Sequence, residues 1–188
     1  FVYISSTSVY GEDAGEWVDE ETQCRPRSSN GQVCLDAELE LRTAIPSAIV
    51  LRLAGIYGPG RLIARIDSLR SGVPLEGNPD AWLNLIHVDD AVETVQAAHD
   101  RGPAGATYVV ADDRPHRRGD YYSLLARLIG APPPVFAQFV AAGDAPAPLN
   151  KRCRNRRIRE ELQVALRYPT LAEGLPAALG PAHSAPPA

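Results

Sequence analysis

The sequence of 188 residues contains no methionine, one lysine and three cysteines, and 6% of its residues are aromatic. The cysteines, Cys24, Cys34 and Cys153, form no C-x-x-C pair, which argues against a disulfide framework and against a zinc site. The chain has no stretch of about 18 apolar residues and no basic leader followed by an apolar run. We therefore expect a cytoplasmic protein that binds no metal and contacts no membrane.

The start of the sequence is unusual because residue 1 lies inside an apolar run, Phe1–Ile4. The β-branched and aromatic residues of this run predict a buried strand, which a run of hydroxyl side chains, Ser5–Ser8, ends. A natural chain normally begins with methionine, so we expect an upstream portion of the protein to precede these residues.

The charge balance disfavours a general nucleic-acid-binding protein, since the formal net charge is -4 and the pI is about 5.6. A hydrophobic content of 45% with 22% charged residues is typical of a globular domain. One basic run, Lys151–Arg157, has no aromatic residues interleaved with it, and we predict that it begins a solvated helix. We expect no nucleic-acid partner.

Hydrophobic periodicity predicts an α/β protein. The strand Phe1–Ile4, a helix over Gln32–Thr43 and a strand over Ala48–Leu53 follow one another, and a crossover of this length indicates a parallel strand pair. Further along the chain we predict helices over 62–71, 88–100, 121–129 and 156–166 and strands over 82–87 and 107–110. Alanine and proline dominate residues 180–188, for which we predict a disordered tail.

Three segments form a recognisable combination. Ser5–Gly11 has the sequence SSTSVYG, Leu51–Gly60 has LRLAGIYGPG, and Asn84–Asp90 has NLIHVDD. In their order and spacing they resemble an atypical branch of the extended short-chain dehydrogenase/reductase family, the NAD-dependent epimerases and dehydratases. The resemblance extends over about residues 1–178 and covers only the carboxy-terminal part of that fold.

The resemblance implies an α/β fold that comprises the carboxy-terminal half of a Rossmann-like, doubly wound parallel sheet and a small substrate-binding α/β region. Residues 1–61 would belong to the NAD(P)-binding domain, and residues 62–179 would form a substrate side with a strand near 107–110 that returns to the sheet. The Gly-rich turn that cradles dinucleotide phosphates in this fold is absent from the sequence. We expect it upstream, within roughly 100 further residues.

The resemblance also implies the site residues. Ser6 lies four places before Tyr10 of the SSTSVYG segment, and it would orient the reacting hydroxyl or carbonyl of a substrate. The residues expected to border the nicotinamide ring of NAD or NADP are Ser5, Ser6, Leu53, Ala54, Gly55 and Ile56. A simpler alternative is that the serines only end a strand and that the glycine only permits a tight turn.

Two departures from the family pattern bear on activity. The positions of the catalytic tyrosine and lysine hold Asn30 and Cys34, which supply neither the tyrosine proton nor the lysine charge. Leu83 occupies a position where sugar-nucleotide members carry a diphosphate-binding arginine. Arg61 and Arg65 could bind another anionic part of a substrate, although exposed helical arginines are more often only solvated.

These observations leave three interpretations open. The first is an NAD(P)-dependent epimerase/dehydratase-like oxidoreductase that acts on an unknown small hydroxyl or carbonyl compound through an atypical active site. The second is a catalytically inactive protein that binds a dinucleotide or a protein partner, and the third is a truncated fragment without function. An unpaired strand edge invites pairing with a second copy of the chain, so a homodimer is also expected.

Overall fold

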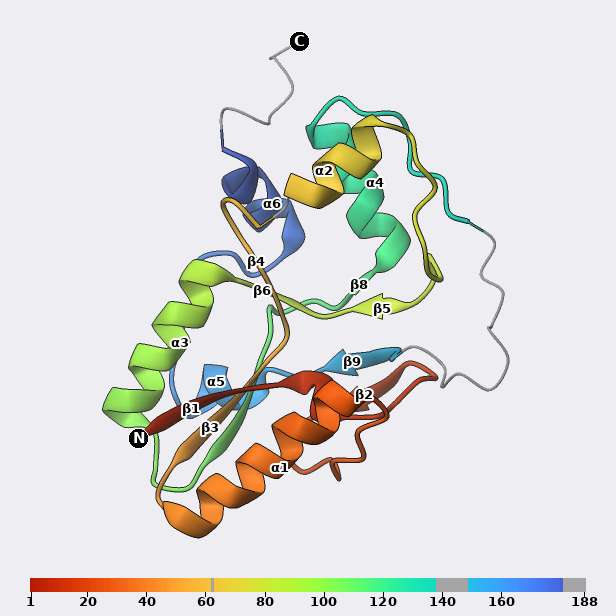
Figure 1. The fold of residues 1–188 in the computed structure, drawn as a ribbon. Coiled ribbons are helices and arrows are strands. Elements are labelled where there is room, and N and C mark those ends of the chain that lie inside the picture. The colour runs from red at the N-terminus through yellow and green to blue at the C-terminus, as the bar shows by residue number, and fades with distance from the viewer. Residues whose placement is uncertain (62, 138–148, 181–188) are drawn as a thin grey trace.

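The computed structural model of the chain describes residues 1–61, 63–137 and 149–180 (Figure 1). Its helices are α1 (Ser29–Ala44), α2 (Ile63–Arg70), α3 (Val88–Arg101), α4 (Arg118–Leu128), α5 (Arg156–Glu160) and α6 (Leu171–Leu179), with a 3-10 turn, η1 (Thr7–Val9). Its strands are β1 (Val2–Ser6), β2 (Glu16–Val18), β3 (Ile49–Leu53), β4 (Gly55–Tyr57), β5 (Trp82–Leu83), β6 (Leu85–His87), β7 (Thr107–Val110), β8 (His116–Arg117) and β9 (Lys151–Cys153).

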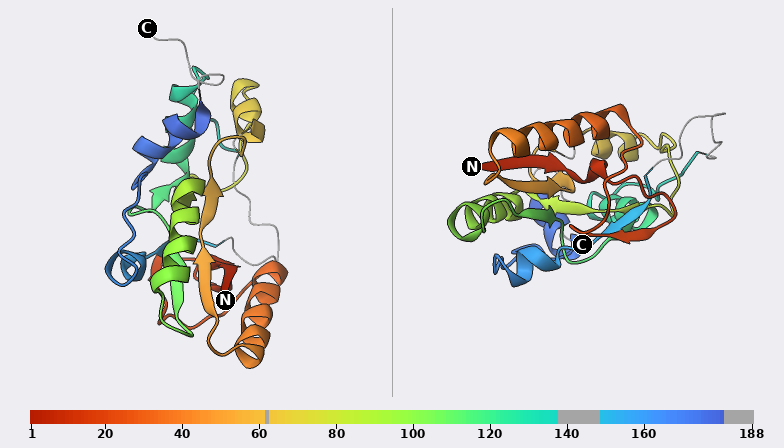
Figure 2. Two further views of the ribbon diagram at one scale, coloured as in Figure 1. Left: turned by 90° about the vertical axis from the view of Figure 1, so that its left-hand side faces the viewer. Right: turned by 90° about the horizontal axis from the view of Figure 1, so that it is seen from below.

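A parallel sheet with the strand order β1-β3-β7 lies at the centre of the fold. Ser6 pairs with Leu53, and Leu53 pairs with Val110, so the three strands end at the same edge. Helix α1 covers one face of this sheet, and α3 and α5 lie on the other (Figure 2). Every residue of β3 is buried, as expected of a central strand in a parallel sheet that is covered on both faces.

The two faces of β3 differ in chemistry. Leu51 and Leu53 belong to an apolar cluster with Ala98 of α3. On the opposite face, Arg52 contacts Glu38 of α1. Because successive side chains of a strand point to opposite faces, one short strand contributes both to the apolar core and to a buried polar network.

Short strands and the helices α2, α4 and α6 form a second region beyond the carboxyl end of the sheet (Figure 1). Strand β4 is parallel to β6, β2 is parallel to β9, and β5 is antiparallel to β8. The helices share an apolar core that includes Ile66, Tyr121, Leu125, Leu171 and Leu175. This region faces the sheet edge at which open α/β folds usually bind ligands.

The predicted strand over 82–87 is interrupted, because β5 and β6 pair with different strands. Between them, the Asn84 side chain bonds to the backbone of β9. Its amide donates to Lys151 O at 2.9 Å, and its oxygen accepts from Cys153 N at 2.7 Å. The side chain thus replaces a peptide group in strand pairing, which the hydrophobic pattern does not reveal.

The basic run begins with a strand, so the predicted solvated helix start is wrong. Strand β9 is parallel to β2, and its residues Lys151 and Cys153 are buried. The Lys151 ammonium donates to Tyr10 O at 3.2 Å. Burial lowers the pKa of this amine below its usual range. The one lysine of the chain therefore belongs to the interior and not to a solvated surface.

The remaining predicted helices and strands are confirmed with shifted ends, and α1 begins at Ser29 rather than Gln32. The helix predicted over 156–166 is too long, since α5 ends at Glu160 and Gln163 has the left-handed φ of 50°. Helix α6, which begins with a capping box of Thr170 and Glu173, was not predicted. The predicted tail lies outside the described residues except for Gly180.

Strand β1 is an outer strand of the sheet among the described residues, and Phe1 and Ile4 expose 68% and 55% of their surface. Apolar side chains on a strand edge invite pairing with another chain. The homodimer stays a prediction. None of the described helices combines the length and the apolar character that crossing a membrane requires.

Candidate functional site

The carboxyl ends of β1 and β3 lie side by side and bring Ser6 to the level of Leu53. Ser6 is half-buried and caps the turn η1, since its Oγ accepts a hydrogen bond from Ser8 N at 3.1 Å. A hydroxyl that accepts one bond still has a proton to donate. No group among the described residues accepts that proton, so Ser6 can donate to a ligand at this edge.

Ser5 has a different environment from its neighbour. Its side chain is buried, and its Oγ donates to Glu38 Oε1 at 2.5 Å. The Ser5 hydroxyl is therefore occupied by the interior of the protein. Any contact of Ser5 with a cofactor would have to come from its backbone.

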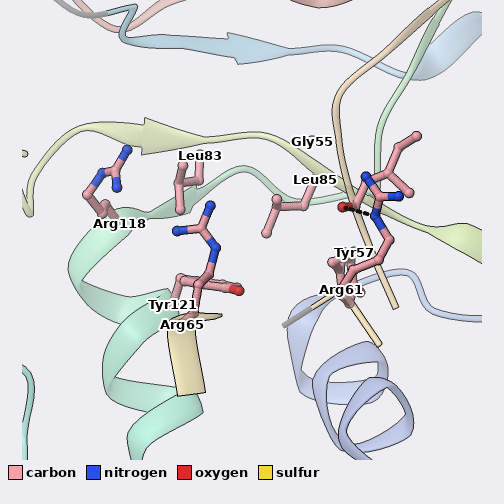
Figure 3. A pocket seen from close by; sticks show the side chains of 9 residues that line it. Gly55, Tyr57, Arg61, Arg65, Leu83, Leu85, Arg118 and Tyr121 are labelled. Atoms are coloured by element: carbon pink, nitrogen blue, oxygen red, sulfur yellow. Dashed lines mark hydrogen bonds between the residues drawn. The ribbon is translucent and has the colours of Figure 1, made fainter. Parts of the chain in front are cut away.

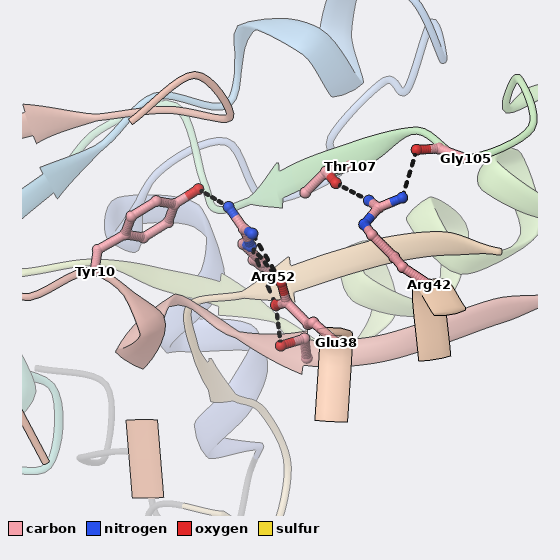
Figure 4. Close-up of polar contacts among 7 residues, drawn as sticks. Tyr10, Glu38, Arg42, Arg52, Gly105 and Thr107 are labelled. Atoms are coloured by element: carbon pink, nitrogen blue, oxygen red, sulfur yellow. Dashed lines mark hydrogen bonds and ion pairs between the residues drawn. The ribbon is translucent and has the colours of Figure 1, made fainter. Parts of the chain in front are cut away.

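A buried polar network links α1 to the central sheet (Figure 4). The Arg52 guanidinium donates to both carboxylate oxygens of Glu38, with Nε at 3.1 Å from Oε1 and Nη2 at 2.7 Å from Oε2. Its Nη1 donates to the hydroxyl of Tyr10 at 2.8 Å. Burial raises the pKa of Tyr10 more strongly than the charge of Arg52 lowers it. Tyr10 is therefore a neutral member of the network at physiological pH.

The turn that follows β3 exposes only part of its backbone. Leu53 and Ala54 are buried, whereas Gly55 is exposed and Ile56 is half-buried. Gly55 N donates to Asn84 O at 3.0 Å, which fixes the turn against the next region. Among the four turn residues expected to border a nicotinamide ring, Gly55 and Ile56 thus offer the accessible surface.

The positions of the usual catalytic pair lie on the first two turns of α1. Asn30 is exposed, and Cys34 is half-buried and packs against a cluster that contains Val9 and Tyr10. The one lysine of the sequence, Lys151, is buried, and its ammonium donates to Tyr10 O. The structure therefore offers neither a tyrosine acid nor a lysine charge at these two positions.

A cavity of about 320 Å³ opens beside the turn after β3 (Figure 3). We call it the arginine cavity; it is lined by Gly55, Ile56, Tyr57, Arg61, Arg65, Leu83, Leu85, Arg118 and Tyr121. The structure thus brings both predicted substrate-binding arginines to one site. Arg118 of α4 lines the same cavity. This was not predicted from the sequence, because a single arginine near the start of a helix does not indicate a binding site.

The three arginines keep donors available for a ligand. Arg61 donates from Nε to Ile56 O at 3.3 Å, and Arg65 donates from Nη1 to the Tyr122 hydroxyl. The side chain of Arg118 has no hydrogen-bond partner among the described residues. Since each guanidinium has five N–H groups, the cavity offers several donors and a positive charge that no carboxylate in its lining compensates.

Three ionisable side chains in this part of the fold have shifted pKa values: Tyr57, which lines the cavity, the buried Asp112 and the half-buried His116. Burial raises the pKa of Tyr57 above its usual range, and the negative charge of Asp112 adds to the shift. Burial also raises the pKa of Asp112 to about 8 and lowers that of His116 to about 4. Asp112 Oδ2 lies 4.0 Å from His116 Nε2, and neither atom has a hydrogen-bond partner among the described residues. Both side chains are therefore uncharged over much of the neutral range.

Metal chemistry finds no support in the described part of the chain, where no group of three or more histidine, cysteine, aspartate or glutamate side chains could hold a metal ion. The three cysteines are free.

Comparison with known proteins identifies a family. The sequence model of the NAD dependent epimerase/dehydratase family matches residues 1–111. The protein YeeZ of Escherichia coli K12 is 30% identical over 171 residues, which make up 89% of this chain and 58% of YeeZ. The chain thus spans little more than half the length of this curated relative.

Solved structures agree with this assignment. The structure of a conserved protein of unknown function from Silicibacter pomeroyi DSS is 37% identical with a TM-score of 0.84, and the match covers 97% of this chain and 67% of that protein. MoeE5, solved in complex with UDP-glucose and NAD, is 25% identical with a TM-score of 0.78, and the match covers 95% of this chain and 62% of MoeE5. The fold is the predicted Rossmann-like α/β fold, and the chain belongs to the NAD-dependent epimerase/dehydratase family.

Proposed function

We propose that the protein is an NAD(P)-dependent oxidoreductase of the epimerase/dehydratase type and that its substrate is a small hydroxyl or carbonyl compound with an anionic group. The arginine cavity carries this proposal. It includes Gly55 and Ile56, the accessible part of the turn expected to border the nicotinamide ring. A substrate whose anionic group binds the arginines would therefore reach the sheet edge at which Ser6 lies.

The residues present fit one side of a nicotinamide cofactor. Ser6, Gly55 and Ile56 are accessible at the edge where β1 and β3 end, and they would border the ring of NAD or NADP. When bound, the cofactor supplies or accepts a hydride. The residues do not fit the ribose contact or the proton transfer, because Asn30 and Cys34 cannot hold the ribose or supply a proton as a tyrosine and a lysine would. No proton transfer is therefore assigned to α1.

Ser6 would position the reacting oxygen of the substrate. Its hydroxyl can donate to a carbonyl oxygen while Oγ keeps its bond to Ser8 N. This bond to the backbone restricts the rotation of the Ser6 side chain. A donor that is held in place in this way stabilises developing negative charge without further reorganisation.

The arginine cavity would determine which substrates bind. Its volume of about 320 Å³ suits a small molecule. The guanidinium groups of Arg61, Arg65 and Arg118 surround it from α4 and from the segment before and within α2. Charge-assisted hydrogen bonds to phosphate or carboxylate are the strong interactions that such a set of donors favours. Leu83 and Leu85 would contact the apolar part of the same molecule.

The second interpretation, a dinucleotide-binding protein without catalysis, has its own supporting observation. Asn30 and Cys34 replace the usual pair, and the nearby Tyr10 is fully buried and bonded to Arg52. Neither the position of the usual tyrosine on α1 nor Tyr10 therefore offers an accessible tyrosine hydroxyl. The two functions differ in one measurable respect, since only the first converts a nicotinamide cofactor.

The test is an absorbance assay of nicotinamide reduction and oxidation with the longest natural chain that contains these residues. Phosphorylated and carboxylated alcohols and ketones serve as candidate substrates. Ser6→Ala should lower kcat on the order of a hundredfold, as expected for loss of one fixed hydrogen-bond donor. Arg65→Gln should instead raise KM by about tenfold or more, since it removes a charged contact to the substrate.

Ser8→Ala is the matched control for Ser6→Ala, because the bond of Ser8 to Ser6 comes from its backbone N and survives the change. Unchanged kcat in Ser6→Ala would contradict the role of this hydroxyl. Saturable cofactor binding without any turnover would favour the dinucleotide-binding protein. Absence of cofactor binding in the longest chain would exclude both functions.

A further inference from the structure

Both tryptophans of the chain stack with arginines on one surface. The Arg152 guanidinium carbon lies 4.8 Å from the ring centroid of Trp17 and 5.2 Å from that of Trp82. Arg117 lies 3.8 Å from the Trp82 centroid, which is the shortest of these distances. We call these four side chains, Trp17, Arg152, Trp82 and Arg117, the Trp–Arg row.

Four short strands that are far apart in the sequence build this row. Trp17 of β2 is the register partner of Arg152 of β9, and Trp82 of β5 is the partner of Arg117 of β8. Strands β5 and β9 are also in contact, and Figure 1 shows β9 between β2 and β5. Strand pairing therefore fixes the positions of these four side chains. Arg152 of the basic run Lys151–Arg157 lies against two tryptophan rings, which the sequence alone did not indicate.

A cavity of about 330 Å³ lies along the Trp–Arg row. It is lined by Trp17, Trp82, Asp113, Arg114, Pro115, His116, Arg117, Asp120 and Arg152. The arginine cavity is a different site, since strands β5 and β8 lie between the two. Trp82 and Arg117 line this cavity, while the adjacent Leu83 and Arg118 line the arginine cavity.

The charges around this cavity favour an anion. Arg114, Arg117 and Arg152 line it together with two carboxylates. The carboxylate of Asp113 already accepts from Asn155 Nδ2 at 2.7 Å and has an arginine nitrogen at 3.6 Å. The carboxylate of Asp120 lies in the first turn of α4, where the helix dipole stabilises negative charge. Three guanidinium groups therefore line the cavity with two carboxylates, of which Asp113 has other partners and Asp120 lies at the positive end of α4.

Stacking on an indole ring leaves the N–H groups of each guanidinium available to a ligand. An indole face occupies the flat face of a guanidinium and leaves its N–H groups in the plane free. Arg152 uses Nε to donate to Gly15 O at 2.7 Å, and Arg117 uses Nη1 to donate to Asp80 O. The remaining nitrogens are held in position without a carboxylate partner. A planar fork of this kind matches the oxygens of phosphate and carboxylate.

We infer that the Trp–Arg row and its cavity form a binding site for the phosphate or carboxylate group of a small molecule. Arg152 and Arg117 would supply the fixed donors, and Arg114 would add charge at the rim. Trp17 is 41% exposed, so part of its ring would remain available to the apolar portion of the ligand. This inference does not depend on the proposed oxidoreductase function.

Intrinsic fluorescence tests the site directly, because Trp17 and Trp82 are the only tryptophans of the chain. The 188-residue chain is titrated separately with inorganic phosphate and with acetate, while sodium chloride keeps the ionic strength constant. We expect a saturable change of the emission with at least one of the two anions. A response to phosphate alone indicates a phosphorylated ligand, and a response to acetate as well indicates that carboxylates also bind.

Arg152→Gln should weaken the anion response by about tenfold or more, as expected when a stacked charged donor is lost. Arg154→Gln is the matched control, since Arg154 also lies over Trp17, at 5.3 Å, but does not line this cavity. Arg117→Gln provides a second test on the other side of Trp82. Thermal midpoints by circular dichroism are measured for each variant to separate binding from folding.

Two results would overturn the inference. One is an emission change that sodium chloride reproduces at equal ionic strength, because it would reflect general screening. The other is a phosphate or acetate response that Arg152→Gln and Arg117→Gln leave unchanged. Arg65→Gln should leave the fluorescence response intact, so a failure of this inference remains distinct from a failure of the proposed function.

Discussion

Arg52 and Glu38 form a buried, two-pronged ion pair that connects the central strand β3 to helix α1. Their side chains expose 10% and 2% of their surface. The same carboxylate accepts from Ser5 of β1, and the same guanidinium donates to Tyr10. One pair of residues thus ties together the helix, two strands and the segment that follows Ser6.

Glu38→Gln should lower the free energy of unfolding by about 3–5 kcal/mol, because it leaves the Arg52 charge buried without a counter-charge. Urea unfolding followed by circular dichroism measures the loss. The matched control is Glu40→Gln, an exposed position on the same helix, which should change stability by less than about 0.5 kcal/mol. Equal stability of the two variants would show that the pair does not hold α1 to the sheet.

Stability should fall as the pH rises from about 6.5 toward 8, owing to Asp112, whereas at lower pH the lowered pKa of His116 acts in the opposite direction. Burial raises the pKa of this carboxyl from 3.8 to about 8, so the folded chain keeps a proton that the unfolded chain releases. Between these values the contribution of Asp112 to the free energy of unfolding should decrease by at most about 1.4 kcal/mol per pH unit. The negative charges of Asp113, Asp90 and Glu173 act in the same direction.

Unfolding midpoints in urea at pH 6.5 and pH 8 measure the effect of Asp112, because this interval lies above the range over which the shift of His116 acts. Asp112→Asn should remove most of the difference between them, because an amide does not titrate. Asp100→Asn, an exposed carboxylate of α3, should preserve the difference. An Asp112→Asn variant with the pH dependence of the unchanged chain would rule out a protonated Asp112.

Gly174→Ala should destabilise the region around the arginine cavity. A Cβ at this position would lie 1.8 Å from the hydroxyl oxygen of Tyr57, so one of the two must move. Overpacking of this kind costs about 1–3 kcal/mol. Gly119→Ala in α4 is the control, because its Cβ would lie 3.4 Å from the nearest atoms, which is ordinary contact.

A double variant, Tyr57→Phe with Gly174→Ala, identifies the cause of the loss. Removal of the hydroxyl takes away the nearest clashing atom, although ring carbon Cζ at 2.7 Å still crowds the new methyl group. We expect partial recovery of the unfolding midpoint measured in urea. No recovery at all would place the strain elsewhere in α6.

The sheet and its helices were predictable because their signals are local. The apolar runs that became β1 and β3 and the helical spacing within α1 depend only on residues close together in the sequence. The parallel pairing followed from the length of the crossover. Strand β9 was not predictable in this way, since its buried lysine and its neighbours β2 and Asn84 come from distant segments.

The site was predictable only in part, for a related reason. Arg61 and Arg65 follow the turn after β3 closely in the sequence, and the structure places both in one cavity. Arg118 reaches that cavity from a different helix, and no pattern near it indicates this contact. The burial of Asp112 was equally hidden, because an aspartate after a strand usually lies in an exposed loop.

Fluorescence titration of this 188-residue chain with NADH and NADPH tests the central claim most directly. The claim is that these residues supply the nicotinamide and substrate sides of a family site and that the chain contains no Gly-rich turn for the dinucleotide phosphates. We predict no saturable binding of either nucleotide by the folded chain. Saturable binding in the micromolar range that Arg152→Gln and Arg65→Gln leave unchanged would contradict the account, because it would require a dinucleotide phosphate site outside the Trp–Arg row and the arginine cavity.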